Sequence, residues 1–276
     1  MEILPKQRDN SEITVSVLWH STVLINMYGK FIITDPVLFE RVWLQIGKWK
    51  VGIKRISPLA IDLKDLPKID MILISHTHMD HLDIQSIKYI VRNNNPDVKI
   101  ICPHNGKKVI GSIASTNEVY ELDRDKSVDI DGISIGARET NHRWARRPRN
   151  KRKHTRWSNK SHSYNAYMIS TRDKRIFFGW DTAYIDIYKN TWYQVDVAIM
   201  PIWGYDPRIR NHCDPEQAID MALDLWAKYF IPIHCETFIL GKEWIHAPRK
   251  LLTELVQDRK DILLWSQIIW DIFIVK

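Results

Sequence analysis

The stretch IDMILISHTHMDH, residues 69–81, decides the fold class, because an apolar run passes directly into a cluster of titratable residues. Residues 69–75 have the apolar pattern of a buried strand, and a helical pattern begins near Leu82. The cluster at residues 76–81 therefore occupies a connection from a buried strand to a helix. Such connections are typical of folds in which helices cover a sheet.

The remainder of the chain has the same mixed character. Short β-rich runs recur at residues 13–18, 23–33, 71–74, 98–102, 133–137, 166–169, 175–178, 197–202 and 229–233. Helical patterns occupy residues 82–93 and 215–228, and the second begins with an Asp-Pro start signal. These are too many strands for a helical bundle. Because the 276 residues contain no internal repeat or linker, we expect a single α/β domain over residues 1–276.

The titratable cluster has the spacing of a metal site. In an extended segment residues two apart point the same way, so His76 and His78 can bind one metal. Asp80 and His81, one turn further on, can bind a second. Imidazole and carboxylate are ligands that suit zinc and similar divalent ions. An ordinary exposed loop is the alternative, but three histidines crowded behind an apolar strand would repel one another when protonated and would gain no core packing.

Further candidate ligands follow other β-rich runs. They are His142, Asp181 and His234. In layered α/β folds the loops beyond one end of the strands gather in one crevice, so these residues could complete two metal sites. Each is also compatible with a structural role, and Asp181 could simply begin a turn.

Composition restricts the class of protein. Hydrophobic residues make up 45% and charged residues 26%, which excludes a disordered or membrane-spanning chain. The first residues lack a secretory signal, so we expect a cytoplasmic location. The cysteines Cys102, Cys213 and Cys235 are too few and too widely spaced for a disulfide framework.

Charge favours anionic partners. The formal net charge is +7, and residues 143–156 hold eight lysines and arginines without an acidic residue. Such an excess suits a phosphate-bearing substrate, an anionic membrane surface or nucleic acid. A solvated loop is the simpler explanation of the charge run.

Several motifs make the chain resemble the metallo-β-lactamase superfamily, in particular the branch of N-acyl-phosphatidylethanolamine-hydrolysing phospholipase D and the ascorbate-6-phosphate lactonases. The resemblance covers roughly residues 15–264. The motifs are HST at residues 20–22, TDP at 34–36, LISHTHMDHLD at 73–83, DTAY at 181–184, YDPR at 205–208, HCDPEQA at 212–218, IH at 233–234 and TF at 237–238.

The resemblance implies an αββα sandwich with two metal ions in one crevice. By the family pattern, the first metal would bind His76, His78 and His142, the second Asp80, His81 and His234, and Asp181 would bridge them. Zinc is the expected metal, with manganese and iron as alternatives. Two metals sharing Asp181 would hold a bridging water and lower its pKa toward about 7, which supplies hydroxide as the nucleophile. Asp80, Asp181 and His212 are the candidate catalytic residues.

Residues around the ligands have supporting roles in this pattern. His212 would bind substrate or deliver a proton, although it could equally be a helix-entry residue. His20 and Asp35 are expected to contact ligand residues, because metal-bound imidazoles usually pass their second N–H to a carboxylate or carbonyl. For Asp35, a plain Asp-Pro turn is the competing interpretation.

The sequence departs from the family where Trp19, Trp180, Trp203 and Glu236 replace common glycines. We expect the three rings to reshape the site. With Arg143 and Tyr205, these tryptophans are the candidate substrate-contacting residues.

Three functions follow from these features. The leading hypothesis is a phospholipase-D-like phosphodiesterase acting on N-acyl-phosphatidylethanolamine or a related phosphodiester. The second is a lactonase or hydrolase of a small phosphorylated metabolite. The third is a nucleic-acid-binding nuclease that uses residues 143–156, although the chain shows no separate RNA-recognition module. Peripheral association with an anionic membrane and a homodimer remain open alternatives.

Overall fold

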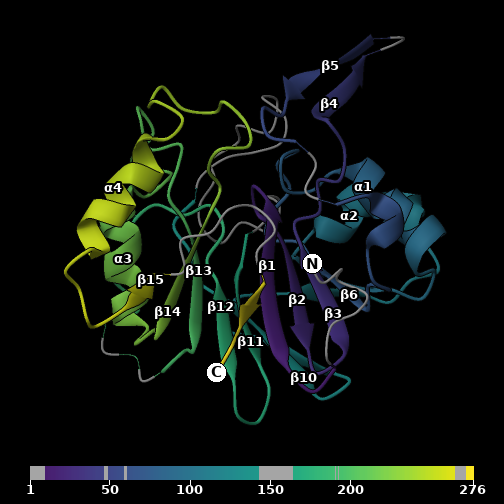
Figure 1. Cartoon of the computed structure of the whole chain (residues 1–276). Coiled ribbons are helices and arrows are strands. Elements are labelled where there is room, and N and C mark those ends of the chain that lie inside the picture. The colour runs from purple at the N-terminus through teal and green to yellow at the C-terminus, as the bar shows by residue number, and fades with distance from the viewer. Residues whose placement is uncertain are drawn as a thin grey trace. The chain divides into compact units, whose positions relative to one another are not determined.

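The computed structural model describes residues 10–46, 49–58, 61–142, 164–189, 191, 193–264 and 272–276. The chain forms two compact units. The first comprises residues 1–123, 144–164 and 269–276, and the second comprises residues 124–143 and 165–268. Each unit contains one seven-stranded sheet (Figure 1). The expectation of a single domain across residues 1–276 stays a prediction.

The sheet of the first unit changes from antiparallel to parallel pairing at its fourth strand, β3. In spatial order its strands are β16 (Phe273–Ile274), β1 (Ile13–Trp19), β2 (Thr22–Met27), β3 (Lys30–Thr34), β6 (Met71–Leu73), β7 (Lys99–Pro103) and β8 (Val119–Leu122). Pairing is antiparallel from β16 to β3 and parallel from β3 to β8. Every residue of β6 is buried, which explains the apolar run before the histidine cluster.

One predicted strand of this unit is wrong. Residues 23–33 form two strands, β2 and β3, joined by a tight turn at Tyr28 and Gly29. Both turn residues have positive φ, at 53° and 88°. Two central residues with positive φ are typical of the hairpin turn that suits the twist of antiparallel strands. The turn escaped detection because Tyr28 is not a residue that favours this conformation.

Helices of the first unit follow the parallel strands. They are α1 (Ile84–Tyr89), which continues as the π-helix η3 (Ile90–Asn94), α2 (Gly106–Ile110) and the 3-10 helices η2 (Leu63–Asp65) and η4 (Gly111–Ala114). Asp83 caps α1, since its side chain accepts from the N–H of Ser86 at 3.0 Å. The helical pattern predicted for residues 82–93 is thus confirmed, and α2 contacts β7 and β8.

The second unit repeats the same change of pairing, here at β12. Its strands in spatial order are β15 (Leu263–Leu264), β14 (Tyr229–Ile233), β13 (Val197–Pro201), β12 (Arg175–Phe178), β11 (Ala166–Ser170), β10 (Ile133–Arg138) and β9 (Ser127–Ile130). Pairing is antiparallel from β9 to β12 and parallel from β12 to β15. Ligands commonly bind outside strand ends where the connectivity of a sheet changes. Asp35 follows β3 directly, and Asp181 follows β12 after two residues.

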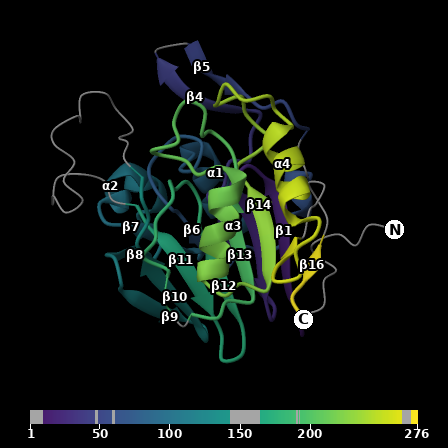
Figure 2. The ribbon, with the colours of Figure 1, turned by 90° about the vertical axis from the view of Figure 1, so that its left-hand side faces the viewer.

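Two helices, α3 (Pro215–Asp224) and α4 (Ala247–Val256), pack against each other beside the second sheet (Figure 2). The predicted start of α3 is confirmed, because the Asp214 side chain accepts from the N–H of Gln217 at 2.9 Å. The helix ends four residues before the predicted residue 228. Trp226 has a left-handed φ of 57°, and the following N–H bonds back to Ala222, which closes the helix.

A hairpin formed by β4 (Arg41–Ile46) and β5 (Trp49–Lys54) extends from the first unit and was not predicted (Figure 1). The short strands β8, β9 and β16 and the helices α2 and α4 were also missed, whereas β15 begins the strand region predicted at residues 263–270. Within the part of the chain that the structure describes, no helix combines the length and apolarity needed to cross a bilayer.

Candidate metal centre

The histidine cluster of the first unit occupies the loop between β6 and α1. The loop turns sharply, because the N–H groups of His81 and Leu82 both bond to the carbonyl of His78, at 3.3 and 2.7 Å. His76 and His81 are buried. Nε2 of His76 lies 2.7 Å from Nδ1 of His78, and the rings of His76 and His81 are 4.2 Å apart. The loop therefore concentrates imidazole nitrogens in one place.

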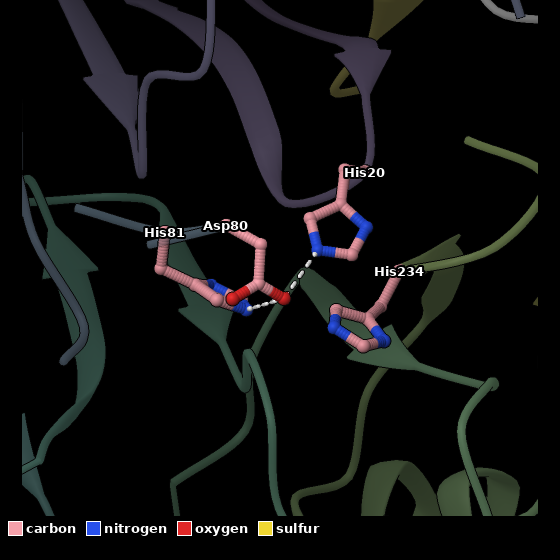
Figure 3. A group of neighbouring side chains, drawn as sticks. All are labelled: His20, Asp80, His81 and His234. Atoms are coloured by element: carbon pink, nitrogen blue, oxygen red, sulfur yellow. Dashed lines mark hydrogen bonds and ion pairs between the residues drawn. The ribbon is translucent and has the colours of Figure 1, made fainter. Parts of the chain in front are cut away.

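Asp80 brings another histidine to this cluster. Its Oδ2 lies 3.3 Å from Nε2 of His20 and 3.6 Å from Nε2 of His81, and Figure 3 shows the carboxylate pointing toward both rings. His20 comes from the turn after β1 and has a left-handed φ of 47°. Because its nitrogen faces the same oxygen as that of His81, His20 is a candidate ligand as well as a supporting residue.

Asp35 lies beneath the cluster and is completely buried. Its Oδ2 accepts from Nδ1 of His81 at 2.7 Å, and its Oδ1 accepts from the backbone N–H of Ser75 at 2.7 Å. The Ser75 hydroxyl also donates to Oδ2. A proton held at Nδ1 leaves Nε2 of His81 as the ligating atom. Asp35 thus has the contact that its predicted supporting role requires, whereas Ser75 was missed because a serine before a histidine carries no distinctive signal.

The second unit brings together the other predicted site residues. Nε2 of His234 lies 2.8 Å from Oδ1 of Asp181, and Nδ1 of His212 lies 3.8 Å from the same oxygen. The rings of His212 and His234 stack at 5.6 Å, and His142 packs edge-on against His212 at 5.4 Å. All four side chains are buried.

Two further features set the protonation of this group. Nδ1 of His142 donates to the carbonyl of Asn211 at 3.1 Å, which leaves Nε2 as its ligating atom. Burial lowers the pKa of His212 to about 3, and the Asp181 carboxylate acts in the opposite direction without overcoming it. His212 is therefore a neutral imidazole at neutral pH. The contact with Asn211 could not be predicted, because it joins segments far apart in the sequence.

Strained backbone marks several of these positions. Left-handed φ values occur at Asp35 (37°), Trp180 (34°), His234 (62°) and Glu236 (55°). Residues with a Cβ rarely adopt this conformation, and it is concentrated at functional sites. The φ values at Trp180 and Glu236 lie in the region that favours glycine, the residue that the family pattern predicts at these two positions.

The predicted substrate-contacting residues differ in their placement. Trp19, Trp180 and Trp203 are at most 1% exposed and therefore lie in the core. Tyr205 is partly buried, and burial raises the pKa of its hydroxyl. Arg143 and the basic loop at residues 143–156 lie outside the described residues. The role of each in substrate binding stays a prediction.

The donor sets fit divalent metal ions. In the first unit, ligating atoms of Asp35, His76 and His81 lie within 4.8 Å of one another, and in the second unit the same holds for Asp181, His212 and His234. Imidazole nitrogens mixed with carboxylate oxygens are typical of zinc, manganese and non-haem iron sites. The division of the seven predicted ligands between two metals stays a prediction.

Comparison with known proteins places this chemistry in a family. A family profile described as the β-lactamase superfamily domain matches residues 32–235. The chain is 31% identical over 262 residues to N-acyl-phosphatidylethanolamine-hydrolyzing phospholipase D 1 of Caenorhabditis elegans, covering 89% of this chain and 70% of that protein.

Solved structures agree on the fold. The metallo hydrolase Igni18 of the archaeon Ignicoccus hospitalis superposes with a TM-score of 0.69 at 16% identity, over 96% of this chain and 98% of that one. CmlA, a diiron β-hydroxylase from Streptomyces venezuelae, superposes with a TM-score of 0.67 at 16% identity, over 96% of this chain and 54% of that one. The predicted α/β sandwich is confirmed, and the fold implies divalent metal ions. The chain therefore belongs to the β-lactamase superfamily and is a metal-dependent hydrolase.

Proposed function

We propose that this protein is a phosphodiesterase with two metal ions that hydrolyses N-acyl-phosphatidylethanolamine or a related phosphodiester. The observation that carries the proposal is the similarity to the nematode phospholipase D over 89% of the chain. The buried imidazole and carboxylate groups of both units supply the donors that such an enzyme needs.

The proposed ligands follow the family pattern. The first metal would bind His76, His78 and His142, the second Asp80, His81 and His234, with Asp181 shared by both. Zinc is proposed, with manganese or iron as alternatives, since all three suit these donors. When bound, two such ions would activate a water molecule for attack on phosphorus and offset the charge on the phosphate oxygens.

The protein's own side chains orient this site. Asp35 holds His81 through its Nδ1–H, and the Asn211 carbonyl holds His142 in the same way. These contacts fix the rings so that their Nε2 atoms face the ligand positions. We assign substrate binding to His212, a neutral imidazole whose Nδ1 is 3.8 Å from Asp181.

Turnover assays test the proposal. Purified protein loaded with zinc, manganese or iron would be assayed on N-acyl-phosphatidylethanolamine and on bis-p-nitrophenyl phosphate. We expect metal-dependent hydrolysis that Asp181→Asn abolishes and His104→Ala preserves, because His104 is partly exposed and outside the ligand set. The absence of hydrolysis of every phosphodiester with each metal would refute the proposal.

A second candidate is hydrolysis of a small phosphorylated metabolite, such as a lactone. The departures from the family pattern at Trp19, Trp180 and Trp203, beside His20, Asp181 and Gly204, motivate this candidate, although the three rings lie in the core. Faster turnover of a short phosphorylated lactone than of the lipid would support this candidate. The basic loop at residues 143–156, which suggested a nuclease, lies outside the described residues.

Three further predictions stay untested. They are peripheral association with a membrane, which a lipid substrate would require, a cytoplasmic location and a homodimer.

A further inference from the structure

Arg55 is a buried cation of the first unit with several of its donors unused. It follows β5 directly, and 5% of its surface is exposed. Its backbone N–H donates to the carbonyl of Glu40 at 2.9 Å, which fixes the base of the β4–β5 hairpin. The guanidinium carbon lies 4.6 Å from the centre of the Trp19 ring, and Nη2 donates to the carbonyl of Val37 at 3.0 Å. These contacts hold the guanidinium in one place.

The remaining guanidinium donors are buried without acceptors. A guanidinium carries five N–H groups and accepts no hydrogen bond. Nε and Nη1 of Arg55 have no hydrogen-bond partner among the described residues, and the indole Nε1 of Trp19 has none either. Burying a charged group with unused donors is costly unless an opposite charge reaches it.

Neighbouring charge does not balance this burial. Burial lowers the pKa of Arg55 to about 10, and the opposing influence is the carboxylate of Glu40. The Glu40 side chain is 66% exposed, so water screens its charge. Among the residues that the structure describes, the cation is therefore only weakly compensated.

Both groups that hold Arg55 lie close in the chain to the histidine cluster. Trp19 immediately precedes His20, which contacts Asp80. Val37 comes two residues after Asp35, which binds His81. Because consecutive Cα atoms are about 3.8 Å apart, the Cα atoms of Trp19 and Val37 lie within about 8 Å of those of His20 and Asp35, respectively. The residues that hold Arg55 are thus chain neighbours of residues that contact the candidate metal centre.

We propose that Arg55 binds the phosphate group of the substrate next to the metal-binding residues of the first unit. Arginine forms strong charge-assisted hydrogen bonds to phosphate, and low exposure strengthens them. The ring of Trp19 stacks on one face of the guanidinium. Tryptophan in place of the family's common glycine at position 19 would therefore help to hold Arg55. The choice of phosphate as the anion rests on the proposed function. The presence of an anion site rests instead on the buried, unpartnered donors of Arg55.

Phosphate binding by the metal-loaded full-length protein tests this assignment. Isothermal titration with inorganic phosphate would compare the wild type with Arg55→Met, Arg55→Lys and the control Arg92→Met, in which an exposed arginine of the same unit is changed. We expect Arg55→Met to weaken binding by at least about tenfold, as for loss of a hydrogen bond to a charged group. Arg55→Lys should show an intermediate loss, and Arg92→Met should leave binding unchanged.

Thermal unfolding separates binding from a structural role. Methionine can pack on Trp19 without a buried charge, so Arg55→Met should keep its melting temperature. A lowered melting temperature with unchanged phosphate affinity would show a structural clamp and overturn the proposal. If Arg55→Met does not fold, Arg55→Lys decides, and wild-type affinity in that variant overturns the proposal.

A second titration distinguishes the source of the phosphate. Dihexanoyl phosphatidylethanolamine supplies a lipid phosphodiester, and inorganic phosphate supplies the free ion. Loss of affinity for both in Arg55→Met indicates recognition of the phosphate group itself, and loss for one alone identifies the source. Because titration needs no turnover, a protein that binds phosphate through Arg55 but hydrolyses no phosphodiester refutes the proposed function and leaves the anion site standing.

Discussion

Asp35 accepts a hydrogen bond from Nδ1 of His81 at 2.7 Å, and both side chains are completely buried. The same carboxylate accepts from the N–H and the hydroxyl of Ser75. One acidic side chain therefore orients His81 and also fixes the backbone just before His76. Removing its charge should weaken metal binding without removing a ligand.

For Asp35→Asn we expect metal affinity to fall by roughly 10- to 100-fold, as is typical when a partner of a ligating histidine is lost. Asparagine preserves the shape of the side chain, but its NH₂ group cannot accept from His81 or Ser75. Competition with a chromophoric chelator measures the affinity. Asp97→Asn, a change at an exposed aspartate of the same unit, is the control. Equal affinity in both variants would show that Asp35 only supports the turn.

Metal binding should also stabilise the folded chain. A ligand at 100 times its dissociation constant adds about 2.7 kcal/mol, which corresponds to a rise of several degrees in the melting temperature of a chain of this size. We expect zinc to raise the melting temperature of the chelator-treated wild type and of His104→Ala. His76→Ala and His234→Ala should show a much smaller rise. A full rise in both variants would contradict the proposed ligand set.

Two tryptophans have a left-handed φ but differ in burial. Comparing their glycine variants therefore separates the energetic effect of backbone strain from that of side-chain packing. Trp180 (φ 34°) is completely buried, and Trp226 (φ 57°) is 59% exposed. Replacing a residue with a left-handed φ by glycine relieves strain and raises the free energy of unfolding by about 1–2 kcal/mol. Loss of a buried tryptophan side chain lowers the free energy of unfolding by about 3–5 kcal/mol. Chemical denaturation should therefore show Trp180→Gly destabilised by roughly 2–4 kcal/mol.

Trp226→Gly should be neutral or more stable by about 0.5–1 kcal/mol, because glycine's extra chain entropy offsets part of the relieved strain. If the Trp180 ring also limits the site, Trp180→Gly should increase turnover of long-chain relative to short-chain substrates. An unchanged ratio would confine Trp180 to a packing role.

The parts of this molecule that could be predicted are those that depend on local sequence. The run before His76 is apolar because β6 is buried, and the Asp214-Pro215 cap is a local signal. Arg55 could not be found this way, because its burial depends on contacts with Trp19 and Val37, which lie far away in the sequence. His20 was not predicted as a ligand, because its contact with Asp80 joins loops that are 60 residues apart in the sequence.

The buried thiol of Cys102 should be unreactive in the folded protein. Burial, assisted by the charge of Glu121, raises the pKa of this thiol to about 12 from an ordinary value of 9.0. Because the folded pKa exceeds the unfolded one, this contribution to stability is complete below about pH 9 and is lost as the pH rises toward 12. Cys102→Ser should have a smaller loss of stability between pH 8 and pH 10.5. Rapid reaction of native Cys102 with a thiol reagent at pH 8, read by mass spectrometry, would contradict this assignment.

The segment between β14 and α4 carries exposed apolar side chains near basic residues, and we expect it to bind membranes reversibly. Ile239 and Trp244 are 62% and 65% exposed on the segment between β14 and α4. That segment joins the loop of Arg208, which donates to the Leu240 carbonyl, and the N–H of Lys242 donates to the carbonyl of Asp206 at 3.0 Å. This segment and its partner Arg208 therefore combine exposed apolar side chains with basic residues, which suits the interface of an anionic bilayer.

We expect this protein to sediment with vesicles that contain anionic phospholipid at low salt and to be released as salt screens the charges. Burying one such side chain is worth about 1.5–3 kcal/mol, so Ile239→Ser combined with Trp244→Ser should lower the bound fraction strongly. Trp226→Ser removes an equally exposed tryptophan after α3 and should leave binding unchanged. Binding that is equal in all three proteins would exclude this segment, and the absence of sedimentation at low salt would exclude peripheral association altogether.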